Sequence, residues 1–168
     1  MYKFDQDKID KISDLLIKQG KTLAVAESCT SGLIQNILSQ AKQATLFYQG
    51  GMTLYNLGQK AKHLNVNPIT SESCNSVSKE VAEKMAIEIT NAFNAELGVA
   101  ITGYAQPMPK LSVNSCVAYI ALAEGTKIIV SRKISGDASK TLLENQIIFM
   151  ENGLTRLHKY LLSKQPRQ

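Results

Sequence analysis

Apolar residues recur at intervals of three and four positions in several stretches of the chain, and this spacing predicts amphipathic helices. Ser78 is expected to cap one of them and Ser139 another, while Gly20 is placed to end the first. A shorter helix is expected from Asn56 to Leu64. The long helical patterns cover residues 5–18, 32–40, 78–94 and 139–162.

Short β-branched and apolar runs between the helices predict strands. Glu124-Gly-Thr126 separates the last two runs as a hairpin turn would, and the Gly50-Gly51 pair is expected to interrupt an earlier strand. The predicted strands are 22–26, 43–55, 97–102, 116–123 and 127–134. Alternating helices and strands indicate an α/β protein with three layers, helices covering both faces of the sheet. The closing hairpin makes that sheet mixed.

A cluster of hydroxyl side chains lies where the first strand turns into a helix. Ser28, Thr30 and Ser31 stand in the segment 24–33, between the apolar run and the helical pattern. Helix N-termini carry unpaired N–H groups and partial positive charge, so this turn suits an anion or an oxyanion. A serine here can cap the helix, bind a phosphate or attack a carbonyl carbon.

Two further polar turns follow predicted strands. One holds Tyr55 and Lys60, and the other spans residues 100–107 and includes Thr102. Ligands of open α/β sheets gather at the carboxyl ends of strands, so the three turns are expected to form one cleft. A lysine whose pKa is lowered can activate a serine nucleophile. The structural alternative is that Tyr55 packs, Lys60 is solvated and Ser28 only caps a helix.

Composition narrows the class of protein. The 168 residues, 44% of them hydrophobic, fit a single globular domain spanning 1–168, with a tail from Ser163 expected to fray. The net charge is +5, but all except three of the 19 basic residues are lysines scattered along the chain, so a nucleic-acid partner is not expected. We expect no membrane-spanning segment and a small-molecule ligand, with a homo-oligomer left open.

Cysteine and histidine usage points away from metal and disulfide chemistry. Cys29, Cys74 and Cys116 are odd in number and lack Cys-x-x-Cys spacing, which fits a cytoplasmic protein without a disulfide framework or zinc site. His63 and His158 lack a context that would suggest a catalytic triad or metal ligand. No cofactor or metal is therefore expected.

Four motifs in order resemble the CinA C-terminal-domain family, which includes nicotinamide-nucleotide amidases. Residues 26–32 read Ala-Glu-Ser-Cys-Thr-Ser-Gly, close to the family's Ala-Glu-Ser-Cys-Thr-Gly-Gly. Gly50-Gly51 precedes Tyr55 and then Lys60 at the family's spacing. Residues 77–82 (Val-Ser-Lys-Glu-Val-Ala) and 102–107 (Thr-Gly-Tyr-Ala-Gln-Pro) complete the match, which runs from about residue 8 to 162.

The resemblance implies hydrolysis of the carboxamide of nicotinamide mononucleotide, or of a related small amide, to the acid and ammonia. It makes Ser28 the nucleophile, Lys60 its base and Tyr55 a helper in proton transfer or substrate placement. N–H groups of the 29–32 turn would stabilise the oxyanion. The implied substrate-binding residues are Thr30, Ser31, Gly32, Thr102 and Gly103.

The chain departs from the family pattern in several places. Ser31 replaces a glycine, and residues 106–111 replace a glycine-rich run. Ala138 and Leu142 stand where the family has arginines, the natural partners of a substrate phosphate. Lys140 or Arg132 could substitute for them. These departures leave open a different amide substrate, or a weak or inactive paralogue that acts as a ligand-binding or assembly module.

Overall fold

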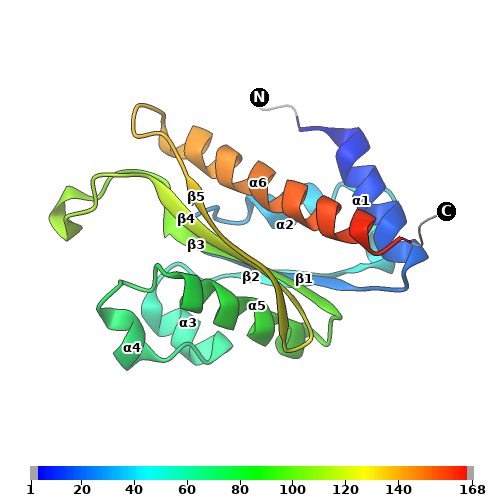
Figure 1. Cartoon of the computed structure of the whole chain (residues 1–168), viewed down its shortest axis with the longest axis horizontal. Coiled ribbons are helices and arrows are strands. Elements are labelled where there is room, and N and C mark those ends of the chain that lie inside the picture. Colours follow the sequence, from blue (N-terminus) through cyan, green and yellow to red (C-terminus); the bar gives the residue numbers. More distant parts are fainter. Residues whose placement is uncertain (1–3, 166–168) are drawn as a thin grey trace.

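The computed structural model describes residues 4–165 and shows a five-stranded mixed sheet between two layers of helices (Figure 1). This confirms the predicted three-layer α/β architecture. The helices are α1 (Gln6–Lys18), α2 (Leu33–Leu38), α3 (Leu57–Leu64), α4 (Pro68–Glu72), α5 (Lys79–Phe93) and α6 (Leu142–Ser163). The strands are β1 (Leu23–Glu27), β2 (Tyr48–Thr53), β3 (Leu97–Tyr104), β4 (Val117–Glu124) and β5 (Lys127–Ser135).

The sheet has the strand order β2-β1-β3-β4-β5. β1 pairs in parallel with both β2 and β3, whereas β3–β4 and β4–β5 are antiparallel. The carboxyl ends of β1, β2 and β3 therefore lie at one edge of the sheet. The turns after β1 and β2 are two of the polar turns singled out in the sequence. In the third, residues 100–104 belong to β3 itself and only residues 105–107 follow the strand.

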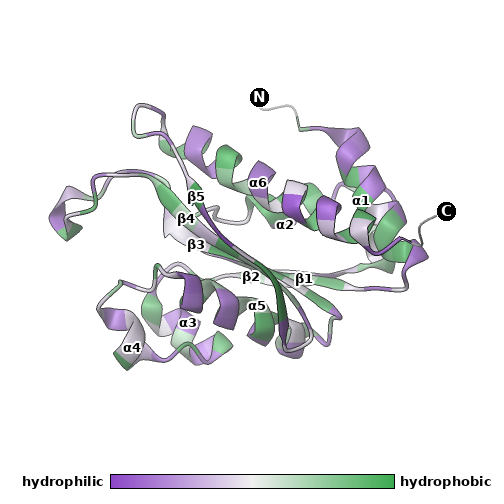
Figure 2. Cartoon of the chain, viewed as in Figure 1, coloured by the Kyte–Doolittle hydropathy of each residue, from purple (hydrophilic) through white to green (hydrophobic). Residues whose placement is uncertain are grey.

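Two hydrophobic clusters hold the layers together, one on each face of the sheet. Helices α1, α2 and α6 contribute residues such as Ile12, Ile34 and Leu154 to the first cluster. Helix α5 packs Met85 and Ile89 into the second. Along α5 and α6, polar and apolar residues alternate as expected of helices that bury one side (Figure 2).

Several helix ends lie where the sequence predicts them. Asp5, Asn56 and Ser78 each accept a hydrogen bond from a backbone N–H in the first turn of their helix. Gly20 follows α1 with a φ of 60°, in the left-handed region that glycine tolerates.

Three local predictions need correction. The last helix begins after Thr141, which forms a capping box with Glu144, whereas Ser139 donates its hydroxyl hydrogen bond to Asp137. β2 runs through Gly50 and Gly51, because a bulge opposite Leu23 and Ala24 absorbs the irregularity without breaking the strand. Residues 44–46 form a 3₁₀ turn rather than strand, and α4 was not predicted.

Candidate active site

A cavity of about 280 Å³ opens at the edge of the sheet where β1, β2 and β3 end. The three turns after these strands contribute to its wall, together with the segment before α5 and the start of α6. Its lining residues are Ser28, Cys29, Tyr55, Asn56, Leu57, Lys60, Asn75, Val77, Gly103, Tyr104, Ala105, Gln106, Met108 and Leu142. Ser28, Tyr55 and Lys60, the expected catalytic residues, thus line one cavity.

The turn that carries Ser28 is held by the carboxylate of Glu27, which is completely buried. Its Oε2 accepts hydrogen bonds from the Thr30 hydroxyl at 2.5 Å and from the N–H of Gly32 at 3.1 Å. The N–H groups of Ile34 and Gln35 donate to the same carboxylate. The positive end of α2 is therefore already occupied by an internal anion. Sequence reasoning assigned this helix end to a ligand and gave no role to Glu27.

The predicted substrate contacts Thr30, Ser31 and Gly32 are not among the cavity-lining residues. Thr30 is buried and its hydroxyl is committed to Glu27. Ser31 is exposed and keeps the left-handed conformation, with a φ of 53°, and Gly32 follows at 95°. Because Ser31 adopts this backbone angle, the turn retains the shape that glycine permits, at a cost of roughly 1–2 kcal/mol.

Some of the backbone N–H groups in the 29–32 turn already donate hydrogen bonds within the protein and so cannot bind an oxyanion. The Ser31 N–H donates to the Ser28 carbonyl at 3.1 Å, and the Gly32 N–H is taken by Glu27. The N–H groups of Cys29 and Thr30 donate to no backbone oxygen among residues 4–165, and both face the Cys29 sulfur, where they oppose the rise in its pKa. A bound group could take these two donors only in place of that weak sulfur acceptor.

Lys60 is the most unusual side chain of the cavity. It lies in the first turns of α3, which Asn56 caps, and is only 2% exposed. Among residues 4–165 no carboxylate forms an ion pair with its amine. Burial lowers the pKa of Lys60 from 10.5 to about 8, so a substantial neutral fraction exists near physiological pH.

Ser28 is 4% exposed and lies beside the cavity with Lys60. No direct hydrogen bond joins the two side chains; catalytic hydrogen bonds are often long in unliganded sites. The neighbouring thiol is a poor alternative nucleophile, because burial raises the pKa of Cys29 to about 12. Tyr55, by contrast, is 67% exposed at the mouth of the cavity, which suits substrate placement better than proton transfer between buried groups.

Thr102 has a different position from the one expected. Its buried hydroxyl donates to the Ser76 carbonyl at 2.8 Å and does not line the cavity, whereas Gly103 does. This bond ties the end of β3 to a turn in which Asn75 and Ser76 both have positive φ, 48° and 59°. Such angles are costly for residues other than glycine and need outside support.

The same turn presents a cavity residue that sequence reasoning missed. Asn75 lines the cavity, and its Nδ2 donates to the Tyr104 hydroxyl at 3.1 Å. Among residues 4–165 its side-chain oxygen Oδ1 accepts no hydrogen bond, so it can accept one from a ligand. The one available signal was the tolerance of asparagine for the left-handed conformation, which does not by itself indicate a binding residue.

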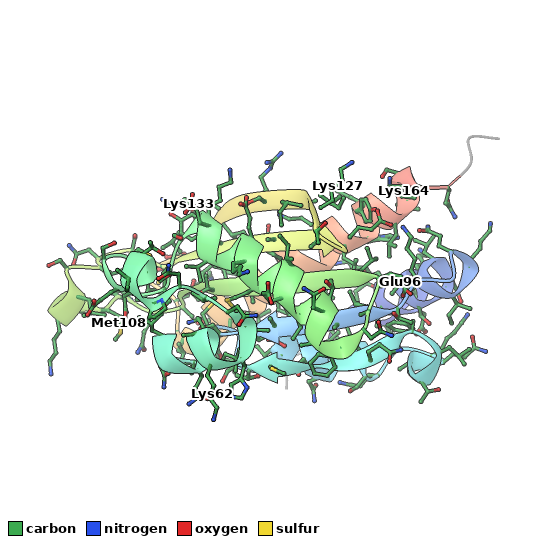
Figure 3. The ribbon with its side chains drawn as sticks, turned by 90° about the horizontal axis from the view of Figure 1, so that it is seen from below. Lys62, Glu96, Met108, Lys127, Lys133 and Lys164 are labelled. Atoms are coloured by element: carbon green, nitrogen blue, oxygen red, sulfur yellow. The ribbon has the colours of Figure 1, made fainter. Side chains whose placement is uncertain are left out.

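The residues considered for a phosphate are spread apart. Leu142 lines the cavity and is 40% exposed, while Ala138 and Lys140 are exposed and do not line it. Arg132 lines a separate groove between β5 and α6 and is not among the residues that line the cavity. In the view of Figure 3, Lys127 and Lys164, which line that groove, lie far from Met108, whereas Lys133, next to Arg132 in the chain, lies nearer to it.

Two general features can be stated for the part of the chain that the structure describes. No three His, Cys, Asp or Glu side chains within residues 4–165 are grouped so as to hold a metal ion. Across the same residues, no helix is both long and apolar enough to cross a membrane.

Comparison with known proteins defines the class to which this fold and cavity belong. The family model of the CinA C-terminal domain matches residues 5–161. The chain belongs to the CinA C-terminal domain family. CinA-like proteins of Chlorobium phaeobacteroides and Desulfotalea psychrophila are 32% and 39% identical to it, over 90% and 64% of this chain. These alignments cover 37% and 26% of the two relatives, so the chain spans about a third of their length.

Solved structures agree on the fold. A CinA-superfamily protein from Klebsiella pneumoniae superimposes with a TM-score of 0.88, covering 96% of this chain and 99% of that one, at 20% identity. An Escherichia coli protein of the same superfamily gives a TM-score of 0.77 at 26% identity, covering 96% of this chain and 94% of that one. At 20% identity, the likeness to the Klebsiella pneumoniae protein shows only that the two share a fold.

Proposed function

We propose that this protein hydrolyses a small carboxamide, with Ser28 as nucleophile and Lys60 as base. The observation that carries the proposal is the buried, unpaired Lys60 in the same cavity as Ser28, because burial gives its amine a pKa of about 8. A surface lysine would be protonated almost completely at neutral pH and could not accept a proton. A lysine that only stabilised the fold would be expected to have a carboxylate partner.

The chemistry follows from the positions of these groups. Neutral Lys60 takes the proton of the Ser28 hydroxyl as its oxygen attacks the amide carbon. In this proposal the oxyanion of the tetrahedral intermediate replaces the Cys29 sulfur as the acceptor of the Cys29 and Thr30 N–H groups, each such donor typically contributing about 3 kcal/mol. Protonated Lys60 then gives its proton to the leaving nitrogen, ammonia departs, and an ester to Ser28 remains. Water, deprotonated by the same amine, cleaves this ester to the carboxylic acid.

The residues around the cavity suit a primary carboxamide. Asn75 offers a free carbonyl oxygen to an amide N–H, and Tyr104 fixes its orientation. Tyr55 provides an aromatic surface at the mouth. The family resemblance implies nicotinamide mononucleotide as the substrate, and a related small amide is the alternative within the same chemistry.

An ammonia-release assay on nicotinamide mononucleotide and a panel of simple aromatic and aliphatic amides tests this proposal. Turnover that is lost in Ser28→Ala and reduced at least ~10²-fold in Lys60→Met is expected, the lower end for general acid–base help. Turnover that survives Ser28→Ala would refute it.

The second candidate is a module that binds its ligand without turnover. The missing hydrogen bond between Ser28 and Lys60 favours this alternative, since an inactive relative need not keep the pair aligned. Binding of an amide by the wild-type protein, with no ammonia released over hours, would select it.

A further inference from the structure

The cavity is almost free of charge. Lys60 is the one lysine among its fourteen lining residues, and no arginine, histidine, aspartate or glutamate lines it. The lining residues that are exposed, and so form its mouth, are uncharged: Tyr55, Asn56, Asn75, Gln106, Met108 and Leu142. Three of these are amides and three are aromatic or apolar.

Apolar side chains concentrate at this mouth. Tyr55, Met108 and Leu142 line it while remaining 36–67% exposed, and all three are large hydrophobic residues. Single exposed apolar residues are ordinary, but several around one opening indicate a surface that contacts a ligand. Such a mouth can bind a ring or an alkyl group. An anion bound there would lose hydrating water without gaining a charged partner, which is unfavourable.

Lys60 cannot bind an anionic group of the substrate and also act as the proposed catalytic base. Its amine is buried with Ser28 at the inner end of the cavity, so an anion bound there would occupy the place of the scissile amide. An adjacent negative charge would also raise the pKa of Lys60 and remove its neutral form. An anionic substituent of a correctly placed substrate would need a second cation, and none of the lining residues within 4–165 provides one.

We propose that the cavity takes a carboxamide carried on an aromatic or apolar group without a phosphate, and that Leu142 is the residue that discriminates against a phosphorylated substrate. This inference rests on the proposed function for the carboxamide and on the mouth residues for the rest. Leu142 is placed for this role because it is the α6 residue that lines the cavity, and the first residue of that helix. A cation there could reach a substituent that projects from the mouth.

The test uses two ligands that differ by one phosphate, nicotinamide riboside and nicotinamide mononucleotide. Binding of each is measured by calorimetry in the Ser28→Ala background, so that turnover plays no part. The riboside is expected to bind at least ~10-fold more tightly than the mononucleotide. Adding Leu142→Arg should shift the ratio of the two dissociation constants by roughly 10–100-fold toward the mononucleotide, the effect of one charged hydrogen bond.

Leu143→Arg is the matched control, because Leu143 is 54% exposed on the next position and does not line the cavity. It adds the same net charge and should leave the ratio within about threefold, since exposed charges are screened by salt. Equal binding of both ligands by the parent, no binding of either, or an equal shift in the two arginine variants would each overturn the inference. Failure of the amidase proposal shows separately, as riboside binding by the wild-type protein without ammonia release.

Discussion

Replacing Lys60 by methionine is expected to stabilise the folded protein while it removes the proposed catalytic base. The amine of Lys60 is buried without an ion-pair partner. Its protonated form therefore carries a desolvation cost in the folded state that is absent in the unfolded chain. Methionine has nearly the same length and carries no charge. The substitution should therefore fill the same space and remove the desolvation cost.

The size of the gain follows from the pKa of Lys60. A fall from 10.5 to about 8 corresponds to roughly 3 kcal/mol, at 1.36 kcal/mol per pKa unit. At pH 7 the amine is mainly protonated in both states, so nearly all of this cost applies to the wild-type protein. Water that enters the open cavity reduces it, and we expect Lys60→Met to add about 1–3 kcal/mol to the free energy of unfolding.

The stability difference between Lys60→Met and the wild type should depend on pH. Between pH values of about 8 and 10.5 the unfolded chain holds the Lys60 proton and the folded protein does not, so raising the pH stabilises the wild-type fold. The advantage of Lys60→Met is therefore full below about 8 and lost as the pH rises to 10.5. Urea unfolding of both proteins across this range measures it, with Lys62→Met as control, because Lys62 is exposed on the same helix.

Two results would contradict the reasoning. One is a Lys60→Met protein less stable than the wild type at pH 7, which would mean that the amine makes favourable contacts in the fold. The other is a stability difference that does not change with pH. If the protein is an amidase, its kcat should also rise about tenfold per pH unit below 8 and level off above it, as the neutral amine accumulates.

Three further substitutions separate the roles of neighbouring residues. Cys29→Ser should change any amidase activity by less than about threefold, measured as ammonia release, because the thiol is not the nucleophile; loss of activity there, with Ser28→Ala still active, would reverse the assignment. Glu27→Gln should cost about 2–3 kcal/mol in urea unfolding, since it places an amide N–H₂ against backbone donors, whereas Glu72→Gln, on the exposed α4, should stay within about 0.5 kcal/mol. Thr102→Val should raise KM more than it lowers kcat, because it frees the turn that presents the cavity's asparagine; an unchanged KM would argue against this positioning role.

Periodicity and turn chemistry predicted the layers, the mixed sheet and the edge at which the cavity opens. These features depend on local patterns that repeat over many residues, and Ser78 shows how well a cap can be placed when a clear apolar stripe follows it. The start of α6 was misplaced although Thr141 and Glu144 carry the capping-box spacing. Ser139 has the same chemistry two residues earlier, but its hydroxyl and N–H both donate to Asp137, two positions before it, in a local turn that keeps Ser139 out of the helix cap.

The parts of the site that sequence reasoning missed depend on contacts between distant segments. Asn75 reaches the cavity because Ser76 is bonded to Thr102, 26 positions beyond it, and Asn75 itself to Tyr104, 29 positions beyond it. Leu142 lines it because α6 begins beside the end of the sheet, and only the family resemblance, not residue spacing, pointed to this position. Neither contact leaves a periodic signal, so the spacing of residues cannot reveal it.

The arrangement of Glu27 and Lys60 links stability to the proposed chemistry. Both side chains are buried near the same turn, and an ion pair between them would be the simplest way to offset their desolvation. Glu27 instead accepts hydrogen bonds from Thr30 and the first turn of α2, which leaves the lysine unpaired. A paired Lys60 would keep a pKa above 10 and could not act as a base near neutral pH. The hydrogen bonds of Glu27 offset its own desolvation, whereas the desolvation of Lys60 is left without a paired charge, and this favours a reactive amine over a structural one.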